Sequence, residues 1–193
     1  ISPVALAFWR WFFVFLFILP FVYSELKKKK MYIKSEIPSL FVLSFTGFGI
    51  CGAFPYISGL TTTVTNMGII YALSPIIIVL LSAIFFHEKL KFLQLIGILT
   101  SFFGVAFVIF KGELENLIYL IFTYGDLWIF IAAVSLAIFS INLINWKSQF
   151  SIFARFTLMS FMGALIIFPF YLIEETYFIQ TTFDKNFILF VLM

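Results

Sequence analysis

Residues 4–24 read VALAFWRWFFVFLFILPFVYS, and residues 25–34 read ELKKKKMYIK. An α-helix rises about 1.5 Å per residue, so about 20 apolar residues are needed to cross a hydrocarbon core of roughly 30 Å. Residues 4–24 have this length and carry a single charge, Arg10. We therefore predict a membrane-spanning helix with its lysines at one headgroup surface. Because the lysines follow the apolar run, the pattern is not that of a cleaved signal peptide.

The composition of the whole chain agrees with a lipid environment. Of 193 residues, 63% are hydrophobic and 11% are charged, against about 45–50% and about 25% in soluble domains. The formal net charge of +3 would suit a nucleic-acid-binding protein, but the cations lie at the edges of apolar stretches, as juxtamembrane anchors do. We therefore expect the lipid bilayer, and no nucleic acid, as a partner.

Six stretches have the length and apolar character of a membrane-spanning helix. They cover residues 4–24, 38–60, 64–86, 92–110, 127–146 and 154–173, and a seventh begins near Phe187. A backbone in lipid must satisfy its own hydrogen bonds, so each stretch is predicted to be helical. The predicted fold class is all-α, a polytopic transmembrane helical bundle. The chain starts at Ile1 and stops inside an apolar run, so we expect it to be truncated at both ends.

The distribution of cations between the links predicts the orientation, because Lys and Arg are retained on the cytoplasmic side. The links after the first, third and fifth helices hold nine cations, namely Lys27, Lys28, Lys29, Lys30, Lys34, Lys89, Lys91, Lys147 and Arg155. The alternate links hold two, Lys111 and Lys185. This asymmetry predicts a multi-pass protein of the cell inner (plasma) membrane with a cytoplasmic loop at Lys27–Lys34.

An internal repeat is visible at an offset of 149 residues. Residues 2–21 align without gaps to residues 151–170, and the identities include Ser2/Ser151, Phe12/Phe161, Leu16/Leu165, Ile18/Ile167, Pro20/Pro169 and Phe21/Phe170. Shared membrane composition is the alternative explanation. If the repeat is real, the matched helices are five spans apart, and an odd number of spans reverses direction. The halves would then be inverted, as in many secondary transporters.

Short motifs occur in an order that resembles the EamA-type branch of the drug/metabolite transporter superfamily. They are residues 2–10 (SPVALAFWR), 59–66 (GLTTTVTN), 72–75 (ALSP), 86–90 (FHEKL), 94–97 (QLIG), 104–105 (GV), 125–127 (GDL) and 135–137 (SLA). The resemblance covers nearly the whole chain. It implies ten helices in two inverted five-helix repeats, of which this chain would hold helices two to seven and the start of eight.

Three segments follow from this assignment. Residues 1–112 are expected to be part of the first repeat, residues 113–125 an external linker with a short interfacial helix, and residues 126–193 part of the second repeat. The resemblance implies a secondary transporter, or permease, for a small molecule. Members move amino acids, drugs, nucleotide-linked sugars and other metabolites, and the motifs do not select among these substrates.

Arg10 is the only charge well inside a predicted span. An intramembrane charge is costly and marks a functional site by default, and the family resemblance also places an arginine here. We hypothesise that Arg10 faces a cavity and attracts a carboxylate or another anion. The alternative is that its long side chain snorkels to the outer headgroups.

Pro75 lies near the middle of its predicted span and removes one helix hydrogen bond. Ser74 and Asn66 are polar neighbours along the chain. In a transporter, this broken turn could present backbone carbonyls to a substrate; otherwise it is a kink accommodated by packing. The threonines before Asn66 could instead cap the helix.

Two further residues complete the candidate substrate pathway. Tyr56 combines an aromatic face with a hydroxyl near the outer end of its span, where either a cavity or an interfacial aromatic belt would use it. Asn142, with Asn145, makes the cytoplasmic end of the fifth span polar, and interhelical hydrogen bonding is the alternative to substrate contact. The small residues Gly97 and Gly104 suit close helix packing.

Other classes of function are less consistent with the sequence. The segment FHEKL at residues 86–90 lacks the second histidine of a zinc-protease motif, so we expect neither a metal nor a catalytic site, and no cofactor. A membrane enzyme should show a cluster of His, Asp, Glu or a nucleophile, whereas the chain has one His. A structural or assembly protein of the membrane stays an alternative, and a homodimer is left open.

Overall fold

The computed structural model describes residues 2–86, 92–109 and 123–177. All regular structure in these ranges is helical, so the all-α prediction is confirmed for the described residues. Three predictions lie outside these ranges: that for residues 87–90 of the FHEKL segment, the interfacial helix before Gly125, and the span that begins near Phe187.

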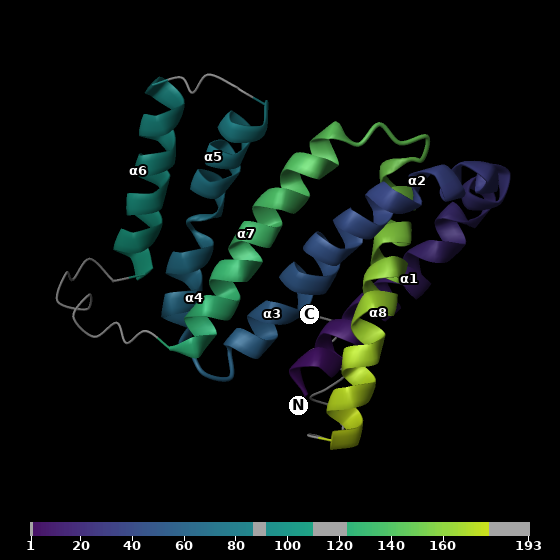
Figure 1. Ribbon diagram of the computed structural model, residues 1–193, viewed down its shortest axis with the longest axis horizontal. Coiled ribbons are helices and arrows are strands. Elements are labelled where there is room, and N and C mark those ends of the chain that lie inside the picture. Colours follow the sequence, from purple (N-terminus) through teal and green to yellow (C-terminus); the bar gives the residue numbers. More distant parts are fainter. Residues whose placement is uncertain (1, 87–91, 110–122, 178–193) are drawn as a thin grey trace.

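The helices follow the predicted spans in order. They are α1 (Pro3–Lys28), α2 (Lys30–Leu43), the π-helix η1 (Ser44–Ile50), α3 (Cys51–Ser58), α4 (Val64–Tyr71), α5 (Ser74–Phe86), α6 (Phe92–Ile109), α7 (Tyr124–Asn145) and α8 (Ile152–Tyr177) (Figure 1). Five helical segments of the described chain are long and apolar enough to cross a membrane, with α2, η1 and α3 forming one of them and α4 and α5 another. The protein is therefore a multi-pass helical membrane protein.

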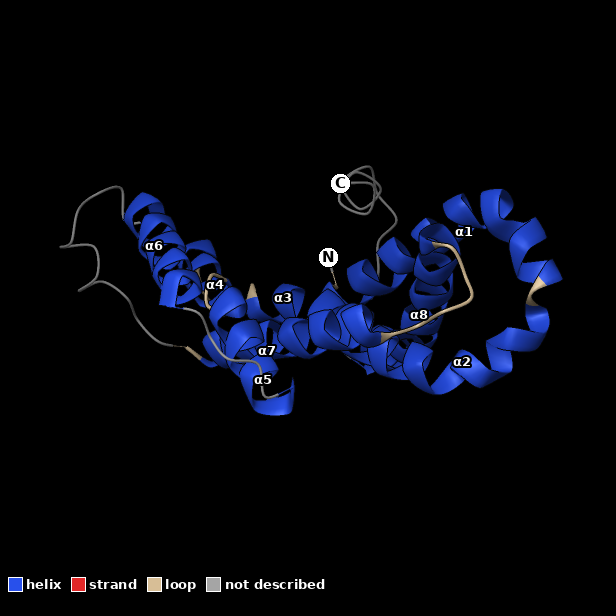
Figure 2. Cartoon of the chain, turned by 90° about the horizontal axis from the view of Figure 1, so that it is seen from above, coloured by secondary structure: helices blue, strands red, loops and turns tan. Residues whose placement is uncertain are grey.

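The segment Lys27–Lys34, expected to be a loop, is helical. Only Lys29 separates the end of α1 from the start of α2, and the two helices form the wide bend visible in Figure 2. Lysine is a good helix former, and cations at the end of α1 are favoured by its dipole. The Lys29 ammonium also pairs with Glu25 at 2.9 Å.

The π-helix η1 interrupts the second span at its middle, and the sequence analysis did not predict it. Its side chains lie close to α8 and α7: a Cβ added at Gly163 would overlap the Phe48 side chain, and one added at Gly47 would overlap Phe139. Phe48 of η1 lies in the core, where it is 3% exposed. Gly163 in α8 and Gly47 in η1 itself make room for this close approach.

Helices α1 and α8 pack side by side and run in opposite directions (Figure 1). The half of their interface nearer the start of α1 contains a cluster in which Ala7 and Ala164 are almost completely buried. Phe8 stacks on Tyr171 of α8 with 5.0 Å between the ring centroids. Small and aromatic side chains therefore alternate along this interface, which gives close backbone approach and a large contact area.

The third predicted span is broken, as Pro75 suggested. Helix α4 ends at Tyr71 and α5 begins at Ser74, so two residues separate them. The expectation of close packing at Gly97 and Gly104 of α6 is wrong within the described residues, because a Cβ added at either position would meet nothing within 4 Å. No described helix covers that face of α6.

Candidate functional site

Arg10 of α1 and Tyr56 of α3 lie in contact. The Arg10 guanidinium donates a hydrogen bond from Nη1 to the Tyr56 hydroxyl at 2.7 Å, and its Cζ lies 5.6 Å from the centre of the Trp11 ring. All three side chains are half-buried. The structure therefore brings together two residues that the sequence analysis proposed separately, with the Arg10 side chain in contact with α3.

In the described residues, the Arg10 guanidinium contacts uncharged groups. The ion pair found there joins Lys29 and Glu25, whereas Arg10 meets a phenol and an indole face. A guanidinium with free N–H groups can hold a carboxylate or phosphate through two parallel hydrogen bonds. This arrangement therefore suits a negatively charged ligand group better than a cationic one.

The break between α4 and α5 leaves polar groups in an apolar helix. Proline has no N–H, so residue 75 cannot donate to the Tyr71 carbonyl as a helix would require. The Ser74 hydroxyl is buried and has no hydrogen-bond partner among the described residues. On the other side of the break, the Tyr71 hydroxyl lies 2.8 Å from Cys51 Sγ. Ser74 and Pro75 thus lie at a break in the helix, where the Ser74 hydroxyl has no hydrogen-bond partner among the described residues.

Asn66 has a different environment from the other proposed residues. Its amide Nδ2 lies 3.3 Å from each carboxylate oxygen of Asp126 at the start of α7, and the Thr62 hydroxyl also donates to this carboxylate. Asp126 in turn accepts a bond from the Thr123 N–H at 2.6 Å, the pattern of a capping box. The group joins α4 to α7. The sequence analysis missed Asp126, although the Thr-x-x-Asp spacing could have revealed its capping role.

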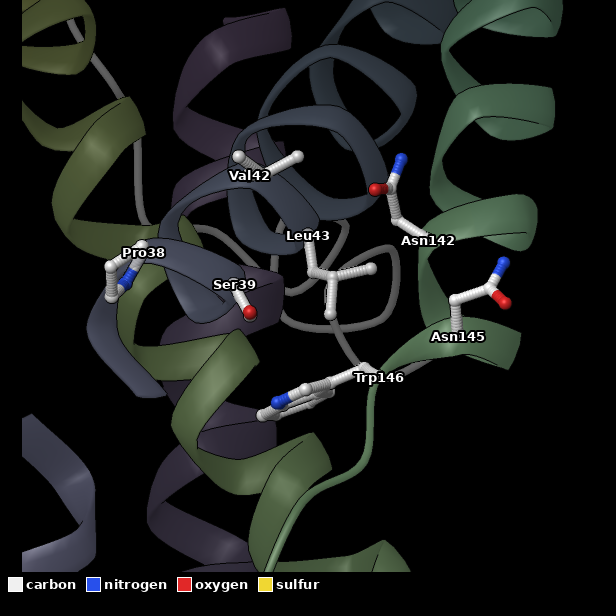
Figure 3. A pocket seen from close by; sticks show the side chains of 7 residues that line it. All are labelled: Pro38, Ser39, Val42, Leu43, Asn142, Asn145 and Trp146. Carbon is white, nitrogen blue, oxygen red and sulfur yellow. The ribbon is translucent and has the colours of Figure 1, made fainter. Parts of the chain in front are cut away.

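Asn142 lines a cavity of about 290 Å³ between α2 and α7 at the lysine-bearing end of the molecule (Figure 3). The remaining lining residues are Pro38, Ser39, Val42, Leu43, Asn145 and Trp146. Each asparagine donates one N–H to its own helix, to the carbonyl of Ile138 or of Ile141. In the described residues these amides are therefore not the interhelical bridges that the sequence allowed. Each side-chain amide retains its oxygen and its second N–H for further hydrogen bonds.

The two segments aligned in the sequence make similar contacts at the two ends of α1 and α8. The hydroxyl of Ser2, before α1, donates to Glu174 near the end of α8. The hydroxyl of Ser151, before α8, donates to Glu25 near the end of α1 at 2.6 Å. Glu25 and Glu174 are 149 positions apart, like the two serines. The sequence alignment stopped at Phe21 and would have found this pair four residues further on.

Comparison with known proteins agrees with this architecture. A model of the EamA-like transporter family matches residues 1–110. Similar proteins include an uncharacterized transporter of Archaeoglobus fulgidus, 26% identical over 70% of this chain and 46% of the relative. Two more are from Bacillus subtilis. The uncharacterized transporter YyaM is 30% identical over 72% of this chain and 46% of the relative. The uncharacterized transporter YetK is 31% identical over 81% of this chain and 48% of the relative. No solved structure matches.

The fold and the apolar spans define a multi-pass, all-helical membrane protein. The chain belongs to the EamA-like transporter family, because the family match covers more than half of it. It spans about half the length of the curated relatives it matches. The family assignment made from short motifs is thus confirmed.

Proposed function

We propose that the protein is a secondary transporter that moves a small metabolite or drug-like molecule across the inner membrane by alternating access between two inverted repeats. Residues 1–112 would form part of the first repeat and residues 126–193 part of the second, joined by an external linker at 113–125. The observation that carries the proposal is the pair of equivalent Ser–Glu contacts at opposite ends of α1 and α8. The family match ends at residue 110, close to the proposed end of the first repeat.

An inverted repeat explains these contacts by symmetry. A two-fold axis in the membrane plane exchanges α1 with α8 and also exchanges the two membrane faces. A contact made at one face must then recur at the other with the helices interchanged, as the Ser–Glu contacts do. Transporters of this design alternate between two conformations in which the repeats exchange their roles. A structural or assembly protein has no need for such equivalence.

The orientation is proposed from the charges at the two ends. The end of α1, the start of α2 and the link before α8 lie together, since Lys29 Nζ donates to the Gln149 carbonyl at 2.5 Å and Glu36 accepts from the Gln149 N–H at 2.9 Å. This end carries the lysine cluster. We assign it to the cytoplasm, following the retention of cations on that side.

The proposed pathway uses polar groups at different depths. Arg10 and Tyr56 would bind an anionic group, Ser74 and the turn before Pro75 would supply polar contacts and a hinge, and Asn142 would line a cytoplasmic mouth. Asn66 would act by bracing α4 against α7 through Asp126. The substrate class favoured by the pair of Arg10 and Tyr56 is a small molecule with a carboxylate or another anionic group.

Transport by the intact protein in proteoliposomes tests this proposal. Vesicles loaded with a broad metabolite mixture would be incubated with a labelled panel of carboxylates and their neutral amide analogues, and uptake would be resolved by mass. We expect protein-dependent uptake or exchange of at least one carboxylate in preference to its amide. Protein-free vesicles are the control. If no compound moves under any imposed gradient, the structural or assembly alternative replaces the transport proposal.

A further inference from the structure

The contact at the cytoplasmic end joins α1 to the N-terminus of α8 through the Glu25 carboxylate. One of its oxygens accepts the Ser151 hydroxyl at 2.6 Å, and the other accepts the Ser151 backbone N–H at 2.9 Å. Lys29 holds the same carboxylate at 2.9 Å from one turn further along the helix. We call Glu25 and Ser151 the inner latch.

The contact at the opposite end joins α8 to the N-terminus of α1 through the Glu174 carboxylate. Its Oε2 accepts the backbone N–H groups of Val4 at 3.0 Å and Ala5 at 3.2 Å, together with the Ser2 hydroxyl. We call Glu174 and Ser2 the outer latch. Both latches place a carboxylate where the positive end of a helix dipole favours it.

The two latches share the same capping serine. Each serine also caps its own helix: Ser2 Oγ accepts the Ala5 N–H at 3.2 Å, and Ser151 Oγ accepts the Ala154 N–H at 3.3 Å. Ala5 and Ala154 are themselves 149 positions apart, and both are 0% exposed. Each latch therefore ties one helix N-terminus to the C-terminal turn of its partner, once at each membrane face.

The interface between the latches is held by packing of apolar side chains. Ala7, Phe8, Ala164 and Ile167 form its buried cluster, and such contacts lack the directional bonds of the latches. Packed apolar helices can rock or shear by small amounts, whereas charge-assisted hydrogen bonds are either made or broken. The apolar middle of the interface can therefore act as a pivot, and the polar contacts at its two ends can open or close.

We propose that the inner and outer latches are the two gates of the transport cycle and that they open alternately. Release of Glu25 from Ser151 opens the cytoplasmic face while the outer latch stays closed. Release of Glu174 from Ser2 opens the external face while the inner latch stays closed. The structure, with both latches closed, represents the occluded state between the two. This inference rests on the proposed alternating access, and it names the residues whose contacts would change between the two conformations.

Site-directed labelling in membrane vesicles tests the latches without a substrate. Two reporters are related by the repeat, Ala5→Cys and Ala154→Cys, each in a Cys51→Ala background and each probed with a membrane-impermeant maleimide from its own face. Glu25→Gln should raise the labelling rate at position 154 about tenfold and lower it at position 5, since the carboxylate bonds are lost. Glu174→Gln should do the opposite.

Glu36→Gln is the matched control at the cytoplasmic face. Glu36 also accepts bonds from the link before α8, from Ser148 Oγ at 2.5 Å and the Gln149 N–H at 2.9 Å, but the residue 149 positions later is Lys185, so it has no equivalent. Its loss should change the labelling at both positions less than threefold. If Glu25→Gln and Glu174→Gln raise labelling at both positions, or behave like the control, the latches are ordinary structural braces and the proposal is overturned.

Milder variants keep the test decisive if a carboxylate variant fails to fold. Ser151→Ala and Ser2→Ala remove one hydroxyl each, and they should shift labelling in the same opposite directions by about threefold. Monodisperse elution in detergent verifies folding. An absence of opposite shifts in folded serine variants also overturns the latches. Failure to find any transported compound would instead count against the transport proposal, because the labelling experiment does not require a substrate.

Discussion

The guanidinium of Arg10 is the residue-scale feature with the clearest chemical consequence. It is held between the Tyr56 hydroxyl and the Trp11 ring, and this leaves its planar group oriented while its charge meets no carboxylate in the described residues. The sequence predicted the importance of Arg10 from its depth in a span. It could not predict the partner, because Tyr56 is 46 positions away and lies in another helix.

Replacement of Arg10 tests its role in transport. Arg10→Lys keeps the charge but loses the planar fork, so the initial uptake rate of a transported carboxylate should fall about tenfold. Tyr56→Phe removes the hydroxyl that orients Arg10 and should have a smaller effect in the same direction. Lys28→Gln, at the exposed end of α1, is the control and should leave the rate unchanged. Full transport of every substrate by Arg10→Lys would contradict the assignment.

At the scale of elements, the π-helix η1 depends on glycine in its neighbours. Gly163→Ala in α8 should lower stability by about 1–3 kcal/mol, since its Cβ would overlap Phe48. Gly97→Ala in α6 meets open space and should be neutral or stabilising by up to about 1 kcal/mol through helix propensity. Thermal unfolding of the two variants in the same detergent compares them. Equal midpoints would mean that η1 does not need this close approach.

The break between α4 and α5 is also an element-scale property. Pro75→Ala restores an N–H that can donate to the Tyr71 carbonyl, so the two helices should become continuous and the thermal midpoint should stay equal or rise. If the break is a hinge of the transport cycle, the maximal rate should fall severalfold. Pro20→Ala is the control, because α1 continues through Pro20 without interruption. An unchanged maximal rate would indicate a kink accommodated by packing.

The arrangement of the whole molecule predicts the exposure of its two ends. The lysine-bearing bend between α1 and α2 and the turn after α3 lie at opposite ends of the bundle (Figure 1). Lys28→Cys and Thr61→Cys, each in a Cys51→Ala background, should therefore react with an impermeant maleimide from opposite sides of the membrane, with position 28 cytoplasmic. Labelling of both from one side would refute the inverted architecture and, with it, alternating access.

Hydropathy alone determined which parts of the chain form spans, because only helices of sufficient apolar length are stable in lipid. The helices at residues 4–24, 127–146 and 154–173 were predicted within a few residues of α1, α7 and α8. The proline at position 75 indicated the break in the third span, and the short motifs indicated the family. These properties depend on residues that are close in the sequence, so the sequence is sufficient to predict them.

Only the tertiary structure decided which helices meet and through which side chains. Apolar residues cover every face of these helices, and lipid supplies no hydrophobic force that would mark the packed face with a periodic pattern. The contacts of Arg10 with Tyr56, Asn66 with Asp126, and the two serines with Glu25 and Glu174 join residues that are 46 to 172 positions apart. Their geometry arises from the close packing of whole helices, which brings polar ends into register.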